Sequence, residues 1–304
     1  GAVTLSKMCG SGMKAAMMAH DMLLAGTHDV MVAGGMESMT NAPYLLQKGR
    51  GGYRLGHDRI FDHMMLDGLE DAYEPGRSMG TFGEDCAAKY GFTRAEQDAF
   101  ATASVERAKA ATASGAFAAE ITPVTVKSRA GETVVSVDEG PGKVKLDKIA
   151  SLKPAFKKDG TITAASSSSI NDGAAALVMM RESTAKKLGA KPLARIVSHA
   201  THAQEPEWFA TAPLGATQKA LAKAGWAVGD VDLWEINEAF AVVPMALMKE
   251  LNLPHDKVNV NGGACALGHP IGASGARIMV TLIYALQARG LKKGLATLCI
   301  GGGE

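Results

Sequence analysis

Residues 10–38 read "GSGMKAAMMAHDMLLAGTHDVMVAGGMES", and the same pattern returns at residues 272–304 as "GASGARIMVTLIYALQARGLKKGLATLCIGGGE". Each copy has a glycine–serine turn, a helical run with few charges, a glycine stop at Gly26 or Gly290, and an apolar strand that ends in a glycine cluster and a glutamate. Two copies of one supersecondary unit at opposite ends of the chain predict a protein with two related halves.

The helices and strands of both copies are apolar on most sides. Met13 and Leu24 in the first helix, and Ile278 and Leu286 in the second, lie among few charges, and helices that are hydrophobic nearly all round are buried. The strands "DVMVAGG" and "LATLCIGG" are continuous apolar runs, which are typical of sheets covered on both faces. The pattern therefore predicts a layered α/β fold with two halves.

The middle of the chain has a different composition. Residues 42–170 carry much of the charge together with scattered glycines and prolines, and we expect them to form an inserted loop domain that covers the substrate. Residues 1–41 and 171–191 would then form the N-terminal half, and residues 192–304 the C-terminal half.

Local patterns predict individual elements between the two copies. They indicate a helix in "RAEQDAFATASVERAKAAT" (94–112), a β-like segment in "ITPVTVKSRAGETVVSVDE" (121–139) and a charged helix in "STAKKLG" (183–189). A strand is expected in "ARIVSHATHA" (194–203).

Composition limits the kinds of partner. The chain has 304 residues, 47% of them hydrophobic, and a net charge of +1, which gives no reason to expect a nucleic acid or a membrane surface as partner. No uninterrupted apolar run approaches the roughly 20 residues that cross a bilayer. The four cysteines are far apart and form no C-x-x-C pair, so the sequence indicates reduced thiols in an intracellular protein, without a zinc knuckle or a disulfide framework. We expect a cytoplasmic protein, with organellar targeting as the alternative because the ends of the chain look incomplete.

Cys9 precedes the first repeated helix in "SKMCGSGMKA", residues 6–15. A helix that begins near Gly12 would direct its unpaired N–H groups at the thiol and lower its pKa, although a buried packing role is equally open on local grounds. The same stretch also satisfies G-x-G-x-x-A, with Glu37 at about the distance of a dinucleotide fingerprint. A short match of this kind is weak, and it leaves Cys9 unexplained.

The second copy carries matching candidates. His269 lies between a glycine turn and Pro270, just before the helix start that corresponds to the one after Cys9. Cys299 ends the second strand, where ligands of open α/β sheets bind. A pseudo-twofold relation between the copies would bring Cys9, His269 and Cys299 together.

Other polar residues allow competing interpretations. Asn237 in "LWEINEAFAVV" ends a strand before a helix expected to begin at Glu238 or Ala239, so it is either an N-cap or an amide that points into the same cleft. His199 and His202 would point to opposite faces of the expected strand, and no carboxylate cluster joins them in sequence, so we assign them no role. Cys86 and Cys265 are interpreted as packing residues.

The motifs together resemble those of the thiolases, the acetyl-CoA C-acyltransferases, over the whole chain. The matching stretches occur in the family's order: "KMCGSGMKA", "AGGMESM", "INDGAAA", "NEAFA", "NGGACALGHPIGASGAR" and "LCIGGG". The resemblance implies the thiolase-like α/β/α/β/α layering, with two pseudo-twofold halves and an inserted loop domain. It also implies acyl-CoA substrates without a tightly bound cofactor or metal, and a homodimer or homotetramer.

The resemblance also implies roles for individual residues. Cys9 would take the acyl group, His269 would accept the Cys9 proton, and Cys299 would move a proton at the α-carbon of the second acyl-CoA. His269 and a water held by Asn237 would stabilise the enolate, and the N–H groups of Cys9 and Gly301 the other oxyanion. The residues that match coenzyme A or tunnel positions of the family are Ser168, Leu69, Met79, Ala239 and Phe240.

The sequence departs from the family at the acyl and pantetheine end. Ser78 stands where acetoacetyl-CoA-specific members usually have histidine, and "ASSSSINDG" (165–173) and "FATAP" (209–213) also differ. Because "CGSGMKA" resembles the biosynthetic type, we expect acetoacetyl-CoA chemistry. A broader or long-chain 3-ketoacyl-CoA thiolase, and a non-catalytic acyl-CoA-binding module, stay as alternatives.

Family members have further strand and helix units before the nucleophile and continue beyond "GGGE". We therefore expect the intact protein to be active, and this stretch alone to fold poorly or to be inert.

Overall fold

The computed structural model describes residues 1–129 and 131–304. Its helices are α1 (Ser11–Leu24), α2 (Met79–Tyr90), α3 (Arg94–Ser114), α4 (Gly140–Lys143), α5 (Glu182–Leu188), α6 (Ala212–Ala224), α7 (Val242–Leu251), α8 (Ala264–Leu267) and α9 (Ile271–Ala288). Its strands are β1 (Val30–Glu37), β2 (Tyr44–Leu45), β3 (Phe61–Asp62), β4 (Val124–Ser128), β5 (Gly131–Val135), β6 (Gly173–Met180), β7 (Leu233–Ile236) and β8 (Gly294–Thr297). Short 3-10 turns include η1 (Met8–Gly10), and η2 (Met65–Leu69) is a π-helical turn.

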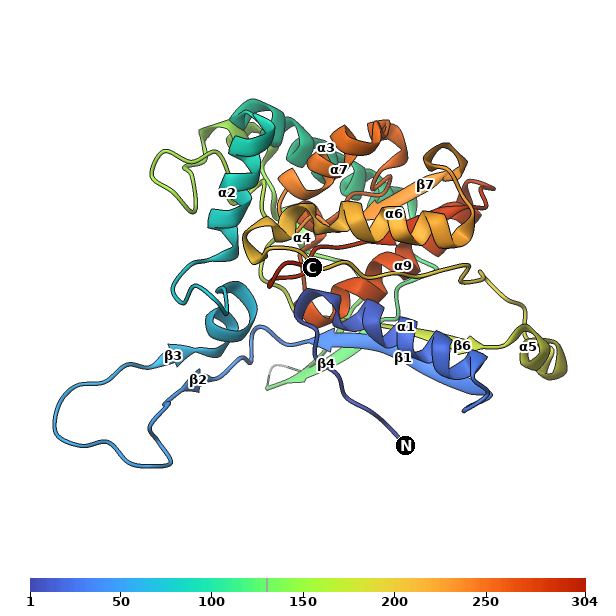
Figure 1. The fold of residues 1–304 in the computed structure, drawn as a ribbon, viewed down its shortest axis with the longest axis horizontal. Coiled ribbons are helices and arrows are strands. Elements are labelled where there is room, and N and C mark those ends of the chain that lie inside the picture. Colours follow the sequence, from blue (N-terminus) through green and yellow to red (C-terminus); the bar gives the residue numbers. More distant parts are fainter. Residues whose placement is uncertain (130) are drawn as a thin grey trace.

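The repeated helices α1 and α9 pack against each other between two sheets. On one side, β1 pairs antiparallel with β6, from Val30 opposite Met180 to Glu37 opposite Gly173. On the other side, β7 pairs in parallel with β8 and contacts α9. Figure 1 shows this order, with β1 and β6 below α1, and with β7, α6 and α7 above. The described residues thus form four layers of the expected architecture: the β1–β6 sheet, the α1–α9 pair, the β7–β8 sheet, and the outer helices α6 and α7.

Glycines allow α1 and α9 to approach closely. A Cβ atom added at Gly12 would lie 2.8 Å from the backbone nitrogen of Ala276, and one added at Gly275 would lie 2.4 Å from that of Met13. Real Cβ atoms do not make such contacts, so the two helix backbones can cross at this distance only with glycine at both positions. The "GSG" and "GASG" turns of the repeat therefore set the helix crossing.

Each glutamate that ends a repeat contacts the start of the other copy. Glu37, at the end of β1, accepts a hydrogen bond through Oε2 from the Gly272 N–H at 2.8 Å, which satisfies a free donor of the first turn of α9. Glu304 forms an ion pair with Lys7, whose N–H donates to the Ser11 hydroxyl at the start of α1. The two glutamates thus hold the two copies together at both ends of their contact, as the predicted pseudo-twofold relation requires.

The burial of the first copy differs from the prediction. Val32 and Met36 on β1 are 71% and 81% exposed, because α1 and α9 cover only one face of the β1–β6 sheet. Leu24, in the last turn of α1, is also exposed. In the second copy Ile278 is fully enclosed, as expected, whereas Leu286 and most of β8 are half-buried.

Helix α9 is long and apolar enough to cross a membrane by length and composition alone. Its 18 residues have a mean hydropathy of 1.3, but 61% of this stretch is buried inside the protein. It lies between the two sheets, as a core helix does.

The inserted region packs largely on the β7–β8 side. Helix α3 begins with a capping box between Thr93 and Glu96, and the predicted β segment forms the exposed β4–β5 hairpin. The loop between β2 and β3 extends away from the body of the molecule (Figure 1). The main hydrophobic core includes Phe82, Ile162 and Trp234.

Residues 194–203 run as an extended segment but form no strand, so that prediction is wrong. Within the described residues, no neighbouring strand pairs with the segment, and a strand requires a hydrogen-bonded neighbour.

Candidate active site

Cys9 lies in the turn η1, directly before α1, where the two repeats meet. Met8 has φ of 46°, which turns the chain sharply before the cysteine. A Cβ added at Gly10 would lie 2.3 Å from Cδ1 of Ile300, so the end of the second copy packs directly against the turn that carries Cys9.

Burial raises the pKa of the Cys9 thiol to about 11, although backbone N–H groups of Gly301 and of Cys9 itself act in the opposite direction. The expected lowering of this pKa at the start of α1 is therefore wrong, because loss of hydration outweighs the nearby N–H dipoles. These two N–H groups are nevertheless the pair expected to hold an oxyanion. A thiol in this state needs a base to remove its proton.

Cys299 follows β8 and is 1% exposed. Burial raises its pKa well above the ordinary value, and the charge of Cys9 adds to the effect, so the two sulfurs lie close enough to influence each other's ionisation. The Asn237 N–H donates to the Thr297 carbonyl at 3.0 Å, which extends the β7–β8 ladder up to the residues before Cys299.

His269 is buried, and one of its ring nitrogens has a side-chain partner. The Ser274 hydroxyl lies against Nδ1 of His269 and is 3.0 Å from the Pro270 carbonyl. In the tautomer in which this hydroxyl donates to the carbonyl and accepts from Nδ1–H, Nε2 presents a lone pair. Nε2 itself has no hydrogen-bond partner within the described residues.

Burial also lowers the pKa of His269 to about 4, and the positive charge of Arg277 adds to this. The ring is therefore neutral at pH 7 and can accept a proton. Its backbone is held by a hydrogen bond from the His269 N–H to the Ser169 carbonyl at 3.1 Å, which joins the serine-rich loop to this turn.

Asn237 is 1% exposed and is not a helix cap, since α7 begins at Val242 with Ala241 as its N-cap. Both polar atoms of its side chain are buried without a hydrogen-bond partner among the described residues. A buried polar group of this kind is costly unless it meets a water or a ligand. Of the two interpretations of Asn237, the structure thus favours the amide that faces the site.

The sequence analysis missed a buried network that holds the site loops. Glu238, which is fully buried, accepts hydrogen bonds from the Ser104 hydroxyl at 2.7 Å, the Asn259 amide at 2.7 Å and the Cys265 N–H at 3.0 Å. Asn259 also makes two 2.8 Å bonds with the backbone of Ile236. The network fixes the "NEAF" and "NGGACALGHP" loops relative to each other. The signal in the sequence was the presence of polar residues inside apolar motifs.

The expected substrate residues lie around the same loops. Ser168 donates to the Ala239 carbonyl from both its N–H and its hydroxyl, each at 3.0 Å. The Phe240 ring meets Phe156 edge to face, at 5.6 Å between ring centres. The Met79 sulfur would lie 3.1 Å from a Cβ added at Gly301, so Met79 borders the oxyanion site.

Leu69, in η2, is half-buried, and its neighbour Gly68 lies against Ile271 at the start of α9. Cys86 and Cys265 are buried in hydrophobic clusters, as predicted. A cavity of about 120 Å³ lies at the end of α3, beside Val137, and none of the predicted site residues lines it.

The dinucleotide interpretation of "GSGMKA" lacks its structural context. That fingerprint requires a strand directly before the glycine turn, whereas residues 1–7 form no strand and η1 precedes α1.

His199 lies beside a carboxylate after all. Its Nε2 is 2.8 Å from Oδ1 of Asp21, which comes from α1, whereas His202 contacts Gln204 and Lys219. The carboxylate lies 178 residues away in sequence, so the local pattern could not reveal it.

Comparison with known proteins agrees with the fold and with these motifs. The profile "Thiolase, N-terminal domain" matches residues 1–183, and "Thiolase, C-terminal domain" matches residues 190–304. The chain belongs to the thiolase family, and its thiolase-like α/β fold is confirmed.

The relatives are acyltransferases. The chain is 52% identical to an acetyl-CoA acetyltransferase of Chromobacterium violaceum, over 99% of this chain and 77% of that protein. It is 46% identical to a probable acetyl-CoA acyltransferase of Staphylococcus aureus, over 100% of this chain and 77% of that protein. The crystal structure of the Bacillus anthracis acetyl-CoA acetyltransferase superimposes with a TM-score of 0.95 at 45% identity, over 99% of this chain and 76% of that chain.

Proposed function

We propose that this thiolase joins two molecules of acetyl-CoA into acetoacetyl-CoA and coenzyme A, and catalyses the reverse cleavage. The observations that carry the proposal are two thiols, Cys9 and Cys299, that lie close enough to affect each other's ionisation, and a buried His269 whose Nε2 has no partner among the described residues. A nucleophile, a base and a second proton carrier are what a two-step acyl transfer to carbon requires.

The first step transfers an acetyl group to Cys9. His269 takes the thiol proton on Nε2 as the sulfur attacks the carbonyl carbon of acetyl-CoA, and coenzyme A leaves with that proton as a free thiol. The N–H groups of Cys9 and Gly301, which act on the thiol in the unliganded protein, stabilise the oxyanion of the tetrahedral intermediate. The thioester on Cys9 is the product of this step.

The second step forms the carbon–carbon bond. His269 accepts the proton of the Cys299 thiol, and the thiolate so formed removes a proton from the α-carbon of the second acetyl-CoA. The resulting enolate, stabilised by the protonated His269 and by a water on the unpartnered Asn237 amide, attacks the acetyl group on Cys9, whose sulfur leaves as a thiolate. Return of the proton from His269 to the Cys9 thiolate restores both thiols and the neutral imidazole.

The residues expected at the coenzyme A end support this use of the site. Ser168 and Ala239 are held together by two hydrogen bonds, Met79 lies beside Gly301, and Phe240 belongs to the same apolar cluster as Met79. We propose that this surface receives the pantetheine arm, with Leu69 on its outer side, and that catalysis needs no tightly bound cofactor.

Acetylation of Cys9 tests the proposal directly. After incubation of the intact protein with acetyl-CoA, peptide mapping by mass spectrometry should find one acetyl group on Cys9. Cys299→Ala should still form this thioester, but it should make no acetoacetyl-CoA. Absence of the acetyl group on Cys9 would favour an acyl-CoA-binding module without catalysis.

Substrate length separates the two enzymatic alternatives. The sequence departs from the family at Ser78 and in the serine-rich loop, at the acyl and pantetheine end, so a broad 3-ketoacyl-CoA thiolase is the second candidate. Cleavage rates of acetoacetyl-CoA and a long-chain 3-ketoacyl-CoA should favour the shorter substrate. A strong preference for the longer one contradicts the proposed specificity.

We also propose that the protein acts as a homodimer or homotetramer in the cytoplasm. The exposed apolar side chains of Val32, Met36 and Val178 on the β1–β6 sheet, and the four free cysteines, support this assignment. Light scattering on the intact protein measures the assembly.

A further inference from the structure

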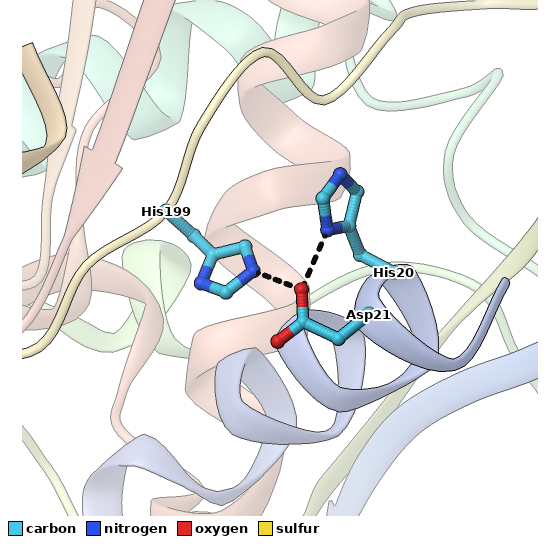
Figure 2. Close-up of side chains that lie close together, drawn as sticks. All are labelled: His20, Asp21 and His199. Atoms are coloured by element: carbon cyan, nitrogen blue, oxygen red, sulfur yellow. Dashed lines mark hydrogen bonds and ion pairs between the residues drawn. The ribbon is translucent and has the colours of Figure 1, made fainter. Parts of the chain in front are cut away.

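A cluster of three metal-ligating side chains lies outside the proposed active site. His20 and Asp21 come from the penultimate turn of α1, and His199 comes from the extended segment that opens the C-terminal half. Figure 2 shows both imidazole rings directed at one carboxylate oxygen, Oδ1 of Asp21. The cluster therefore joins segments that belong to different halves of the fold.

The distances suit a common metal ion. Asp21 Oδ1 lies 3.0 Å from His20 Nδ1 and 2.8 Å from His199 Nε2, and all three donor atoms lie within 4.8 Å of one another. Ligands on a tetrahedral zinc ion, at about 2.0–2.1 Å from the metal, are about 3.3 Å apart. The two distances to Asp21 thus differ from the zinc spacing by a few tenths of an ångström, whereas the two histidine nitrogens, within 4.8 Å of each other, would adjust through their side-chain torsions.

The kinds of donor define the class of ion. Two imidazole nitrogens and one carboxylate oxygen suit zinc and neighbouring first-row divalent ions better than calcium or magnesium, which prefer oxygen ligands. To bind the ion, the ring nitrogen of each histidine that now forms a hydrogen bond with Asp21 must present its lone pair to the metal. The opposite nitrogen of each ring makes no hydrogen bond to the described residues, so the proton can move there.

The surroundings leave the cluster ordered and accessible. The His20 and His199 side chains are 20% and 23% exposed, and their rings meet edge to face at 5.1 Å between centres. The Ser198 hydroxyl and the Lys223 ammonium anchor the segment by hydrogen bonds to the Ala220 and His199 carbonyls. Asp21 is 62% exposed, which leaves a side open for ion entry and for water as a fourth ligand.

We propose that His20, Asp21 and His199 bind a divalent transition-metal ion, with zinc as the first choice, at a structural site between the two halves. The site lies about 16 Å along α1 from Cys9, so the ion takes no part in the acyl transfer. It would connect α1, which follows the nucleophile, to the segment whose Gln204 N–H donates to the Gly303 carbonyl at 2.8 Å. A bound ion therefore stabilises the junction between the halves.

Zinc binding by the protein tests the proposal. Equilibrium dialysis against Zn²⁺ at pH 7.5 should be done with Cys9→Ser as the parent, because a free thiol could bind zinc by itself. We expect one tightly bound ion per chain. His20→Asn and His199→Asn should each weaken zinc binding more than 10-fold. Loss of a residue that only supports a metal ligand already costs about 10- to 100-fold in affinity, and loss of the ligand itself should cost at least the lower of these values.

Two further variants separate a metal site from a hydrogen-bonded cluster. Asp21→Asn keeps a hydrogen-bond acceptor at an exposed position but removes the charge, so it should weaken zinc binding without loss of folding by circular dichroism. His28→Asn, an exposed histidine just after α1, is the matched control and should bind zinc as the parent does.

Thermal unfolding supplies a second readout. Zinc should raise the Tm of the parent and of His28→Asn, but not that of His199→Asn, because an ion stabilises only the state that binds it. The proposal is overturned if the parent binds no zinc tightly, or if the parent, His20→Asn and His199→Asn bind it equally.

Discussion

Removal of the Ser274 hydroxyl should slow the acetylation of Cys9 without unfolding the protein. We expect this hydroxyl to donate to the Pro270 carbonyl and to accept from Nδ1 of His269, which keeps the lone pair on Nε2. In Ser274→Ala, the buried Nδ1–H either loses its acceptor or moves its proton to Nε2, where it blocks the base. Both outcomes disfavour the reactive state of His269.

The size of the effect follows from the burial of the pair. Ser274 is 0% and His269 is 6% exposed, so water cannot replace the lost acceptor. An unsatisfied buried donor costs about 1–3 kcal/mol, and each 1.4 kcal/mol is about tenfold in rate, so acetylation should slow about 5- to 150-fold. Single-turnover reactions with acetyl-CoA, quenched and analysed by mass spectrometry, measure this rate.

Thr281→Val is the matched control for Ser274→Ala. Thr281 is also buried in α9 and donates a hydrogen bond, but its acceptor is Glu120 rather than a site residue. Valine keeps its shape, so this variant should lose stability while its acetylation rate stays near that of the parent. Acetylation of Ser274→Ala within about twofold of the parent rate would refute the tautomer assignment, because the energetic cost above predicts a larger loss.

Three further perturbations test separate parts of the structure. Asn237→Ala should lower kcat about 100-fold, the typical effect of one lost oxyanion donor, with little change in urea denaturation, because the side chain has no hydrogen bond to the described residues. Burial raises the pKa of Glu235 from 4.5 to about 8, so its contribution to stability is present below pH 4.5 and is lost as the pH rises through 8. The free energy of unfolding of Glu235→Gln, measured in urea at pH 5 and pH 8, should therefore depend less on pH than that of the parent. Glu37→Ala should lower the free energy of unfolding by about 1 kcal/mol in urea, because the first turn of α9 loses its acceptor for the Gly272 N–H, whereas Glu37→Gln should retain most of the stability.

Elements defined by local signals could be predicted from the sequence. Helix α3 begins at the Thr93–Glu96 capping box and ends at Gly115, which has φ of 72°, and α5 ends at Gly189 in the same left-handed conformation. Signals of this kind act through the nearest turn of backbone and do not depend on the rest of the fold. The repeated glycine motifs similarly indicated the paired central helices.

Features that depend on distant neighbours could not be predicted in this way. Among the residues that the structure describes, the segment 194–203, expected to be a strand, has no pairing partner, and β1 has only one covered face. The direction of the Cys9 pKa shift depended on burial by the other copy, which a helix start alone does not reveal. The Glu238 network and the meeting of Asp21 with His199 likewise exist only in the folded chain.

The reciprocal contacts of Glu37 with Gly272 and of Glu304 with Lys7 have a consequence for how the protein loses activity. The nucleophile belongs to one repeat, and the base and second thiol belong to the other. The reactive geometry therefore exists only while these contacts between the repeats are intact. A local opening there would separate Cys9 from Cys299 while both repeats keep their helices. Inactivation by mild denaturant should therefore come before the loss of helical structure.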